Sequence, residues 1–175
     1  DFMKRVVVES NLVKWLERWL DRCDHRKDRD NALSFLTYEY ARFKAIAEGD
    51  TTFNVWRHAL NISPAGKLDD VMFIPEGGTF VICPETGGIE CGTHGHLGPD
   101  GQPASPNTLA KVTGKANIGH RHSPIILDGL YGAGTSSVLR LGYNKGPSSW
   151  AHCHTVVYPT GKRTLLFVQN GRWRA

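Results

Sequence analysis

The stretch "KRVVVESNLVKWLERWLDR" (residues 4–22) places a short β-branched run directly before an amphipathic helical pattern. β-branched residues favour a buried strand. The apolar residues that follow recur at helical spacing: Leu12, Trp15, Leu16, Trp19 and Leu20. Asn11 falls between the two patterns, where an Asn side chain can cap a helix. The stretch therefore predicts a strand that turns directly into a helix.

Helical patterns continue to about residue 60, and short strands take over from about residue 70. A second helix is predicted near 30–48, ended by Gly49, and its apolar stripe includes Leu33, Leu36, Tyr40, Phe43 and Ala47. A shorter helix is predicted over 54–60. Beyond residue 70, glycine and proline punctuate short strands, and one helix at 105–114 begins with a Ser cap and a Pro. This order predicts a mixed α/β sandwich rather than a regular β-α-β alternation.

The length of 175 residues predicts a single domain, 1–175, with a strand and helices in 1–62 and a strand-rich part in 70–175. No apolar run approaches the roughly 20 residues that a membrane span needs, and no signal peptide is visible. The four cysteines are scattered, so we expect reduced thiols and a cytoplasmic location. A net charge of +4 permits contact with nucleic acid without requiring it.

Six of the eight histidines fall in three His-x-His pairs, "GTHGH" (92–96), "GHRH" (119–122) and "AHCH" (151–154). Residues i and i+2 of a strand point to the same face, so each pair can present two imidazoles together. Neutral imidazole suits Zn, Mn, Fe or Ni. The first two pairs have flanking glycines that allow close approach of the backbone. We therefore predict that these pairs bind metal, and that His152 and His154 support them indirectly.

The same residues resemble the motifs of calcineurin-like metallophosphoesterases. "GHRH" is similar to the closing Gly-His-x-His motif of that superfamily, and "CGTHGHLGPDG" (91–101) to its preceding single-histidine motif. "VVVESN" (6–11), followed by a helix, is similar to the Gly-Asn-His-(Asp/Glu) motif. The tail from residue 139 to 174 looks more specifically like DNases and phosphoesterases of tailed bacteriophages.

This resemblance implies a site for two divalent ions, with Mn²⁺ expected and Zn²⁺, Mg²⁺, Fe or Ni accommodated. The implied metal ligands are Asn11, His94, His120 and His122. His96, beside His94, is the implied catalytic residue or a further ligand. Two ions some 3.5–4 Å apart can activate a water for attack on a phosphodiester, here in DNA. The implied fold is a two-sheet sandwich flanked by helices.

Three departures from the family pattern matter. The Asp-x-His and Gly-Asp-x-x-Asp motifs should precede Asn11 and are not found there. Leu12 stands where the motif's catalytic histidine is expected, and Val13 where its acidic neighbour is expected. Ser10 replaces a glycine, a minor change. The resemblance therefore implies the carboxyl-terminal part of an enzyme, incomplete on its N-terminal side. The missing ligands would come from an N-terminal portion or another chain. Self-association could cover an exposed sheet edge. The expected location is the bacterial host cytoplasm.

Two other functions remain open. One is a structural zinc module that draws four ligands from the first two histidine pairs and Cys91. The other is a nucleic-acid-binding module, because cationic and aromatic residues are interleaved near the carboxyl end. The cationic residues are Lys145, Lys162, Arg163, Arg172 and Arg174, and the aromatic residues are Tyr143, Trp150 and Trp173. Of these, the predicted nucleic-acid contacts are Lys145, Trp150, Lys162, Arg163 and Arg172.

Overall fold

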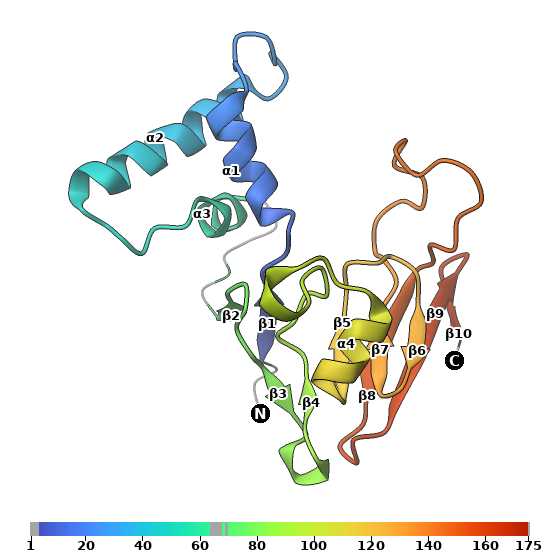
Figure 1. The fold of residues 1–175 in the computed structure, drawn as a ribbon. Coiled ribbons are helices and arrows are strands. Elements are labelled where there is room, and N and C mark those ends of the chain that lie inside the picture. Colours follow the sequence, from blue (N-terminus) through green and yellow to red (C-terminus); the bar gives the residue numbers. More distant parts are fainter. Residues whose placement is uncertain (1–3, 64–67, 69, 175) are drawn as a thin grey trace. The chain divides into compact units, whose positions relative to one another are not determined.

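The computed structural model describes residues 4–63, 68 and 70–174. The chain divides into two compact units, Asp1–Phe73 and Ile74–Ala175, each described by itself below (Figure 1). Helices and several sheets occur together, so the predicted α/β class is confirmed. The boundary between the units falls close to the predicted change from helices to strands. Among the described residues, no helix is long and apolar enough to cross a membrane.

In its described residues, 4–63, 68 and 70–73, the first unit has three helices and a two-stranded sheet. Its elements are β1 (Arg5–Val8), α1 (Val13–Arg22), α2 (Ala32–Glu48), α3 (Val55–Asn61) and β2 (Val71–Ile74), with β1 paired to β2. The N–H of Leu12, at the cap position of α1, bonds the Ser10 hydroxyl at 3.2 Å. Asn11 lies in the turn just before, so the predicted strand-to-helix turn is confirmed.

A small aromatic core holds the three helices together. Leu20, Phe35 and Val55 are buried, one from each helix, and the rings of Trp19 and Phe35 meet edge to face at 5.1 Å. The guanidinium of Arg42 bonds the Asp21 carboxylate at 2.6 Å and so ties α2 to α1. Each of these contacts joins residues from different helices, so they fix the helices against one another.

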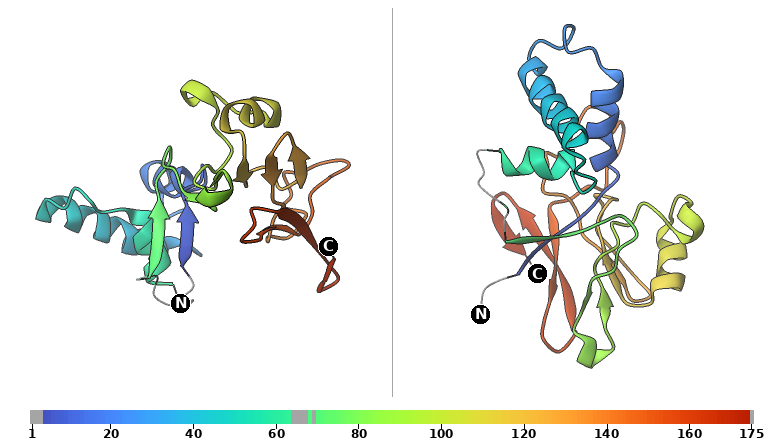
Figure 2. Two further views of the ribbon diagram at one scale, coloured as in Figure 1. Left: turned by 90° about the horizontal axis from the view of Figure 1, so that it is seen from below. Right: turned by 90° about the vertical axis from the view of Figure 1, so that its left-hand side faces the viewer.

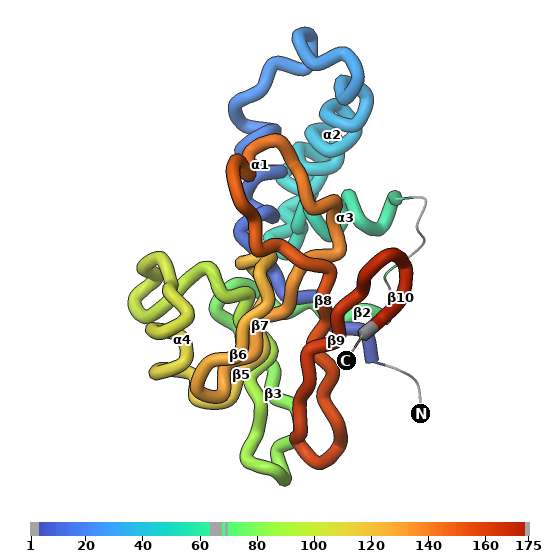
Figure 3. Tube along the Cα trace, turned by 90° about the vertical axis from the view of Figure 1, so that its right-hand side faces the viewer, coloured from blue at the N-terminus to red at the C-terminus, as the bar shows by residue number. Residues whose placement is uncertain are grey.

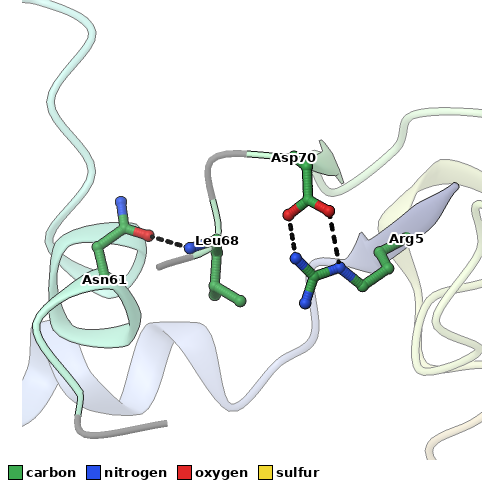
Figure 4. Close-up of polar contacts among 4 residues, drawn as sticks. All are labelled: Arg5, Asn61, Leu68 and Asp70. Atoms are coloured by element: carbon green, nitrogen blue, oxygen red, sulfur yellow. Dashed lines mark hydrogen bonds and ion pairs between the residues drawn. The ribbon is translucent and has the colours of Figure 1, made fainter. Parts of the chain in front are cut away.

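Polar contacts fasten the strands of this unit. In Figure 4, the guanidinium of Arg5 on β1 forms a two-point ion pair with the Asp70 carboxylate, just before β2. The side-chain oxygen of Asn61, the last residue of α3, accepts a hydrogen bond from the Leu68 N–H at 3.3 Å. These bonds hold the start of β2 next to β1 and the end of α3.

The apolar stripe of α2 is exposed. Leu33 and Tyr40 keep 79% and 72% of their surface accessible, and Leu36 and Phe43 are also exposed. The buried residues of the helix are Phe35 and Ala45, on the opposite side. Helix α2 thus carries apolar residues on two sides, and helical spacing alone does not say which side packs.

The second unit contains two sheets. Its elements are β3 (Val81–Ile82), η1 (Pro84–Thr86), β4 (Ile89–Glu90), η2 (Pro99–Gly101), α4 (Pro106–Thr113), β5 (Ala116–Ile118), β6 (Ile125–Leu127), β7 (Leu130–Gly132), β8 (Cys153–Val157), β9 (Arg163–Gln169) and β10 (Arg172–Arg174). The five-stranded sheet has the order β3-β4-β5-β7-β6, and the three-stranded sheet has the order β10-β9-β8. The pairs β4–β5 and β5–β7 are parallel, and the other strand pairs of this unit are antiparallel.

Helix α4 covers part of the five-stranded sheet (Figure 2). The predicted Ser cap is confirmed, since the Ser105 hydroxyl accepts the Thr108 N–H at 3.1 Å. Leu109 and Ala110 of this helix are buried together with Ala116, Ile118 and Leu130 of the sheet. This cluster is the apolar core of the second unit, and it packs α4 against β5 and β7.

Two features join the three-stranded sheet to the five-stranded one. The Gly134 N–H bonds the Cys153 carbonyl at 2.9 Å, and a Cβ at Gly134 would lie 2.0 Å from the Ala151 carbonyl oxygen, so only glycine fits there. The Arg163 guanidinium donates to the carbonyls of Ala116 (2.8 Å) and Gly129 (2.7 Å). It also lies 4.1 Å from the centre of the Tyr131 ring.

Arg163 therefore has a structural role in this unit, and the exchange Arg163→Lys tests it. A lysine has one ammonium and cannot reach both carbonyls in the fork geometry of arginine. We expect the exchange to lower the free energy of unfolding by about 2 kcal/mol, measured by urea titration at pH 7. The reverse exchange at its exposed neighbour, Lys162→Arg, is the matched control. Equal effects of the two exchanges would contradict the structural role.

Candidate metal centre

Two of the histidine pairs lie in loops that leave neighbouring parallel strands. His94 and His96 follow β4, and the loop after β5 carries His120 and His122. Because β4 and β5 are parallel, their carboxyl ends lie at the same edge of the sheet. The Gly119 N–H bonds the His94 carbonyl at 3.0 Å and so joins the two loops directly.

Three imidazole rings meet at this edge. The centroid of the His94 ring lies 5.3 Å from that of His96 and 5.3 Å from that of His120, and the rings of His96 and His120 are 5.8 Å apart. Two imidazoles on one ion, each with its nitrogen about 2.1 Å away, place their ring centroids about 5 Å apart. The rings are therefore spaced as ligands of a single ion would be.

The side chains are not oriented as a finished ligand set. Within the described part of the chain, no group of three or more His, Cys, Asp or Glu side chains is arranged to hold a metal ion. The close spacing of the three rings is therefore the observation that marks this edge as a candidate metal centre.

His96 has one ring nitrogen fixed and the other without a partner. Its Nε2 lies 2.7 Å from Oε1 of Glu76, and since a carboxylate only accepts, Nε2 carries the proton. Nδ1 is then the nitrogen with the free lone pair, and it is buried without a hydrogen-bond partner among the described residues. Histidine ligands of metals commonly donate their other ring N–H to a carboxylate in this way.

The backbone of the second loop is strained at both histidines. His120 has φ of 67° and His122 has φ of 60°, in the left-handed region that side chains with a Cβ disfavour. Such conformations cost of order 1–3 kcal/mol each and cluster at functional sites. The first loop is equally tight, because Gly95 has φ of 102° and a Cβ there would lie 3.0 Å from that of Ile118.

Burial and neighbouring charges favour the neutral forms of His94 and His120. Burial first, and then the positive charges that His120, His96 and His122 would carry, lower the pKa of His94 from 6.5 to about 4, whereas Glu76 acts in the opposite direction. The pKa of His120 is also lowered, by burial first and then by His96, His122 and Arg121. At neutral pH both groups hold the uncharged form that can bind a metal ion.

Cys91, at the start of the first loop, has a different environment. Its sulfur accepts a hydrogen bond from Nδ2 of Asn117 at 3.3 Å, and burial raises the pKa of the thiol. Oδ1 of Asn117 in turn accepts a bond from Arg163 at 3.1 Å. A protonated thiol in such a network is a poor zinc ligand, because zinc binds the thiolate.

The remaining predicted site residues are spread over the chain. The ring of His122 lies against Trp150, with centroids 4.3 Å apart. Nε2 of His152 donates to the Ser137 carbonyl at 2.8 Å, and His154 is exposed on β8, so their predicted supporting roles stay predictions. Asn11 belongs to the other compact unit, and its predicted role as a ligand stays a prediction as well.

The predicted nucleic-acid contacts lie on several different segments of the second unit. Lys145 is exposed in the segment between β7 and β8; Lys162 and Arg172 are exposed near opposite ends of β9. Arg163 instead donates hydrogen bonds to carbonyl groups of the five-stranded sheet, as described above. The side chain of Arg174 lies outside the described part of the structure.

Sequence reasoning missed Glu76 and the internal role of Arg163. Glu76 lies twenty residues before His96 in a Pro-Glu-Gly-Gly turn, and nothing in that turn marks it as the partner of a histidine. The sequence predicts that Arg163 contacts nucleic acid like the cations near it, because its charge is visible in the sequence and its contacts are not. Both residues act through contacts that only the folded chain creates.

Comparison with known proteins finds one informative similarity. The chain is 40% identical, over 177 aligned residues, to a protein named "Protein A1" of Escherichia phage T5. The alignment covers 100% of this chain and 31% of that protein, so the chain spans about a third of the length of the relative it matches. No family model matches the chain, and no solved structure matches it. The similarity connects the chain with a bacteriophage protein.

The lowered pKa of His94 predicts a pH dependence of stability. A histidine with a folded pKa of about 4 instead of 6.5 binds its proton less readily in the folded state, so unfolding is favoured as the pH falls. We expect the urea midpoint of the chelator-treated chain to fall between pH 6.5 and pH 4. The His94→Gln variant should show a smaller fall over the same window. Equal pH dependence in the two chains would contradict the assignment.

The left-handed backbone of His120 predicts an unusual order of tolerated substitutions. Glycine adopts φ of 67° without strain, so His120→Gly should leave the free energy of unfolding within about 1 kcal/mol of the parent chain. His120→Val should be clearly less stable, because a β-branched side chain is strained there. Urea unfolding of the two variants measures the difference. Equal free energies of unfolding for the two variants would contradict the left-handed backbone at residue 120.

Proposed function

We propose that this chain carries the metal-binding histidines of a calcineurin-like metallophosphoesterase and serves in the metal-dependent hydrolysis of phosphodiesters in DNA. The observation that supports it most is His96, whose buried Nδ1 has no partner in the described structure while Glu76 fixes the opposite nitrogen. A buried, unpaired ring nitrogen costs free energy unless a ligand takes it up. A metal ion is the ligand that matches a cluster of neutral imidazoles.

The residues that would hold the ions follow from the geometry and from the family motifs. His94, His96 and His120 share one cluster and would bind one divalent ion. His122, next to His120 in the motif, would serve the second ion. In this assignment His96 is a ligand through Nδ1 rather than the catalytic residue. When bound, a pair of divalent ions such as Mn²⁺ would activate a water and stabilise the leaving oxygen.

The family's carboxylate ligands are the part of the site that this sequence does not supply. Its first two motifs do not occur ahead of Asn11, and Leu12 occupies the position of the motif histidine. We propose that those ligands come from residues outside this sequence, in the same or another chain. The phage relative is about three times as long as the aligned segment, since that segment covers 31% of it.

DNA is the proposed substrate because of charge and origin. Exposed Lys145, Lys162 and Arg172 supply cations for a phosphate backbone. The similarity to a protein of phage T5 supports a bacteriophage origin and, with it, the bacterial host cytoplasm as the place of action. The chain's own residues would thus bind the backbone and hold the ions in neutral imidazole ligands.

Calorimetric titration of the chelator-stripped chain with MnCl₂ and ZnCl₂ tests the metal site. We expect Mn²⁺ binding that His96→Ala abolishes and that Glu76→Gln weakens about 10- to 100-fold, because the carboxylate orients the imidazole. His58→Gln, on helix α3 of the other unit, is the matched control and should bind as the parent does. Urea unfolding of each variant separates lost ligands from lost fold.

The outcomes decide between the proposals. A single tightly bound zinc ion without any manganese response would support the structural zinc module instead. A folded parent chain that binds neither ion would refute the metal-centre proposal. Manganese binding followed by metal-dependent release of p-nitrophenol from bis(p-nitrophenyl) phosphate would support phosphodiester hydrolysis directly.

A further inference from the structure

The loop between β7 and β8 (residues 133–152, the β7–β8 loop) is anchored beside the His120–His122 loop. Figure 3 follows it away from the sheet and back. The Ala151 N–H bonds the His122 carbonyl at 3.2 Å, and the hydroxyls of Ser123 and Ser149 share a hydrogen bond of 2.8 Å. The base of the loop is therefore fixed to the end of the His120–His122 loop by backbone and side-chain bonds.

Two aromatic rings lead outward from His122 along this loop. Trp150 packs against His122, and the Tyr143 ring lies 5.6 Å from that of Trp150 at an interplanar angle of 66°. Tyr143 nevertheless keeps 61% of its surface exposed, so it is not a core residue. The turn that presents it is held by Asn144, whose side chain accepts from the Leu141 N–H (2.9 Å) and donates to the Leu139 carbonyl (2.7 Å).

The loop belongs to a segment without negative side chains. From Gly129 to Ala175 the sequence contains no Asp or Glu, and it contains six Lys and Arg residues. Arg140 and Lys145 flank Tyr143 on the loop itself and are exposed. An exposed aromatic ring between two cations, with no carboxylate in the same segment, suits a ligand that is anionic and aromatic at once.

A nucleotide has both properties, and an unpaired one fits best. In a duplex the faces of the bases are already stacked on one another, so a protruding tyrosine reaches only the backbone. In a single strand the faces are free, and aromatic side chains stack on them regardless of sequence. A purely apolar partner would leave Arg140 and Lys145 without counter-charges.

We infer that Tyr143 and Trp150 form a stacking site for unpaired nucleotides and direct a single DNA strand, or the frayed end of a duplex, toward the histidine cluster. The inference rests on the proposed function for its substrate, and it adds the strand type that the site selects. Arg140 and Lys145 would contact the phosphates on either side of the stacked base.

Fluorescence anisotropy of labelled DNA tests the inference without any metal. In EDTA, the chain should bind a strand of about 15 thymidines roughly tenfold more tightly than a duplex of equal length. Tyr143→Ala should weaken binding of the strand about tenfold, and Tyr143→Phe should restore it, since the ring and not the hydroxyl stacks. Tyr158→Ala, another exposed tyrosine of the acid-free segment, is the matched control and should leave the affinity unchanged.

Two results would overturn the stacking site. The first is that the chain binds single strand and duplex with equal affinity. The second is that the Tyr143→Ala variant binds the single strand with an affinity within twofold of that of the parent chain. Failure of the hydrolase proposal gives a different pattern. Mn²⁺ binding in the calorimeter involves no DNA, so it reports on the metal centre alone and should not change in Tyr143→Ala. A folded chain that binds strands but binds neither Mn²⁺ nor Zn²⁺ keeps the stacking site and loses the metal centre on which the hydrolase function rests.

Discussion

The guanidinium of Arg163 is the contact on which the second unit depends. It enters from β9 and satisfies carbonyls at β5 and at the turn before β7, two segments of the other sheet. It also fixes Asn117, which holds the sulfur of Cys91 at the start of the loop that carries His94 and His96. One half-buried cation thus connects the packing of the two sheets with the position of the histidines. Its charge is tolerated because carbonyl oxygens and the Tyr131 ring surround it.

Much of the fold could be predicted from the local sequence, because helix caps and turns depend on residues close together in the chain. The Ser105 cap, the left-handed end of α2 at Gly49 and the strand-to-helix turn around Asn11 all depend on residues a few positions apart. The exposed face of α2 could not be predicted in this way. Periodicity identifies an apolar face, and the choice between two such faces is made by α1 and α3, which are distant in sequence.

The candidate site could likewise be predicted only in part from the sequence. The His-x-His spacing and its glycines are visible in the sequence, and the parallel pairing of β4 and β5 then brings the two loops together. Glu76 could not be predicted, since it comes from a turn before that sheet and is selected only by its distance from His96. For Arg163 the reverse holds: its charge suggested a contact with nucleic acid at the surface, whereas its hydrogen bonds give it a structural role within the fold. Long-range contacts decide which polar residues serve a site and which serve the fold.

The absence of carboxylates after Asp128 also has a kinetic consequence. The segment from Gly129 onward carries six cationic and no acidic side chains, and the whole chain has a net charge of +4, so the residues before it carry a net charge of −2. A polyanion that diffuses toward the chain is drawn to one end of the sequence and weakly repelled by the rest. Its first encounter is therefore oriented rather than random, and the rate of that encounter must fall as salt shortens the reach of the charges.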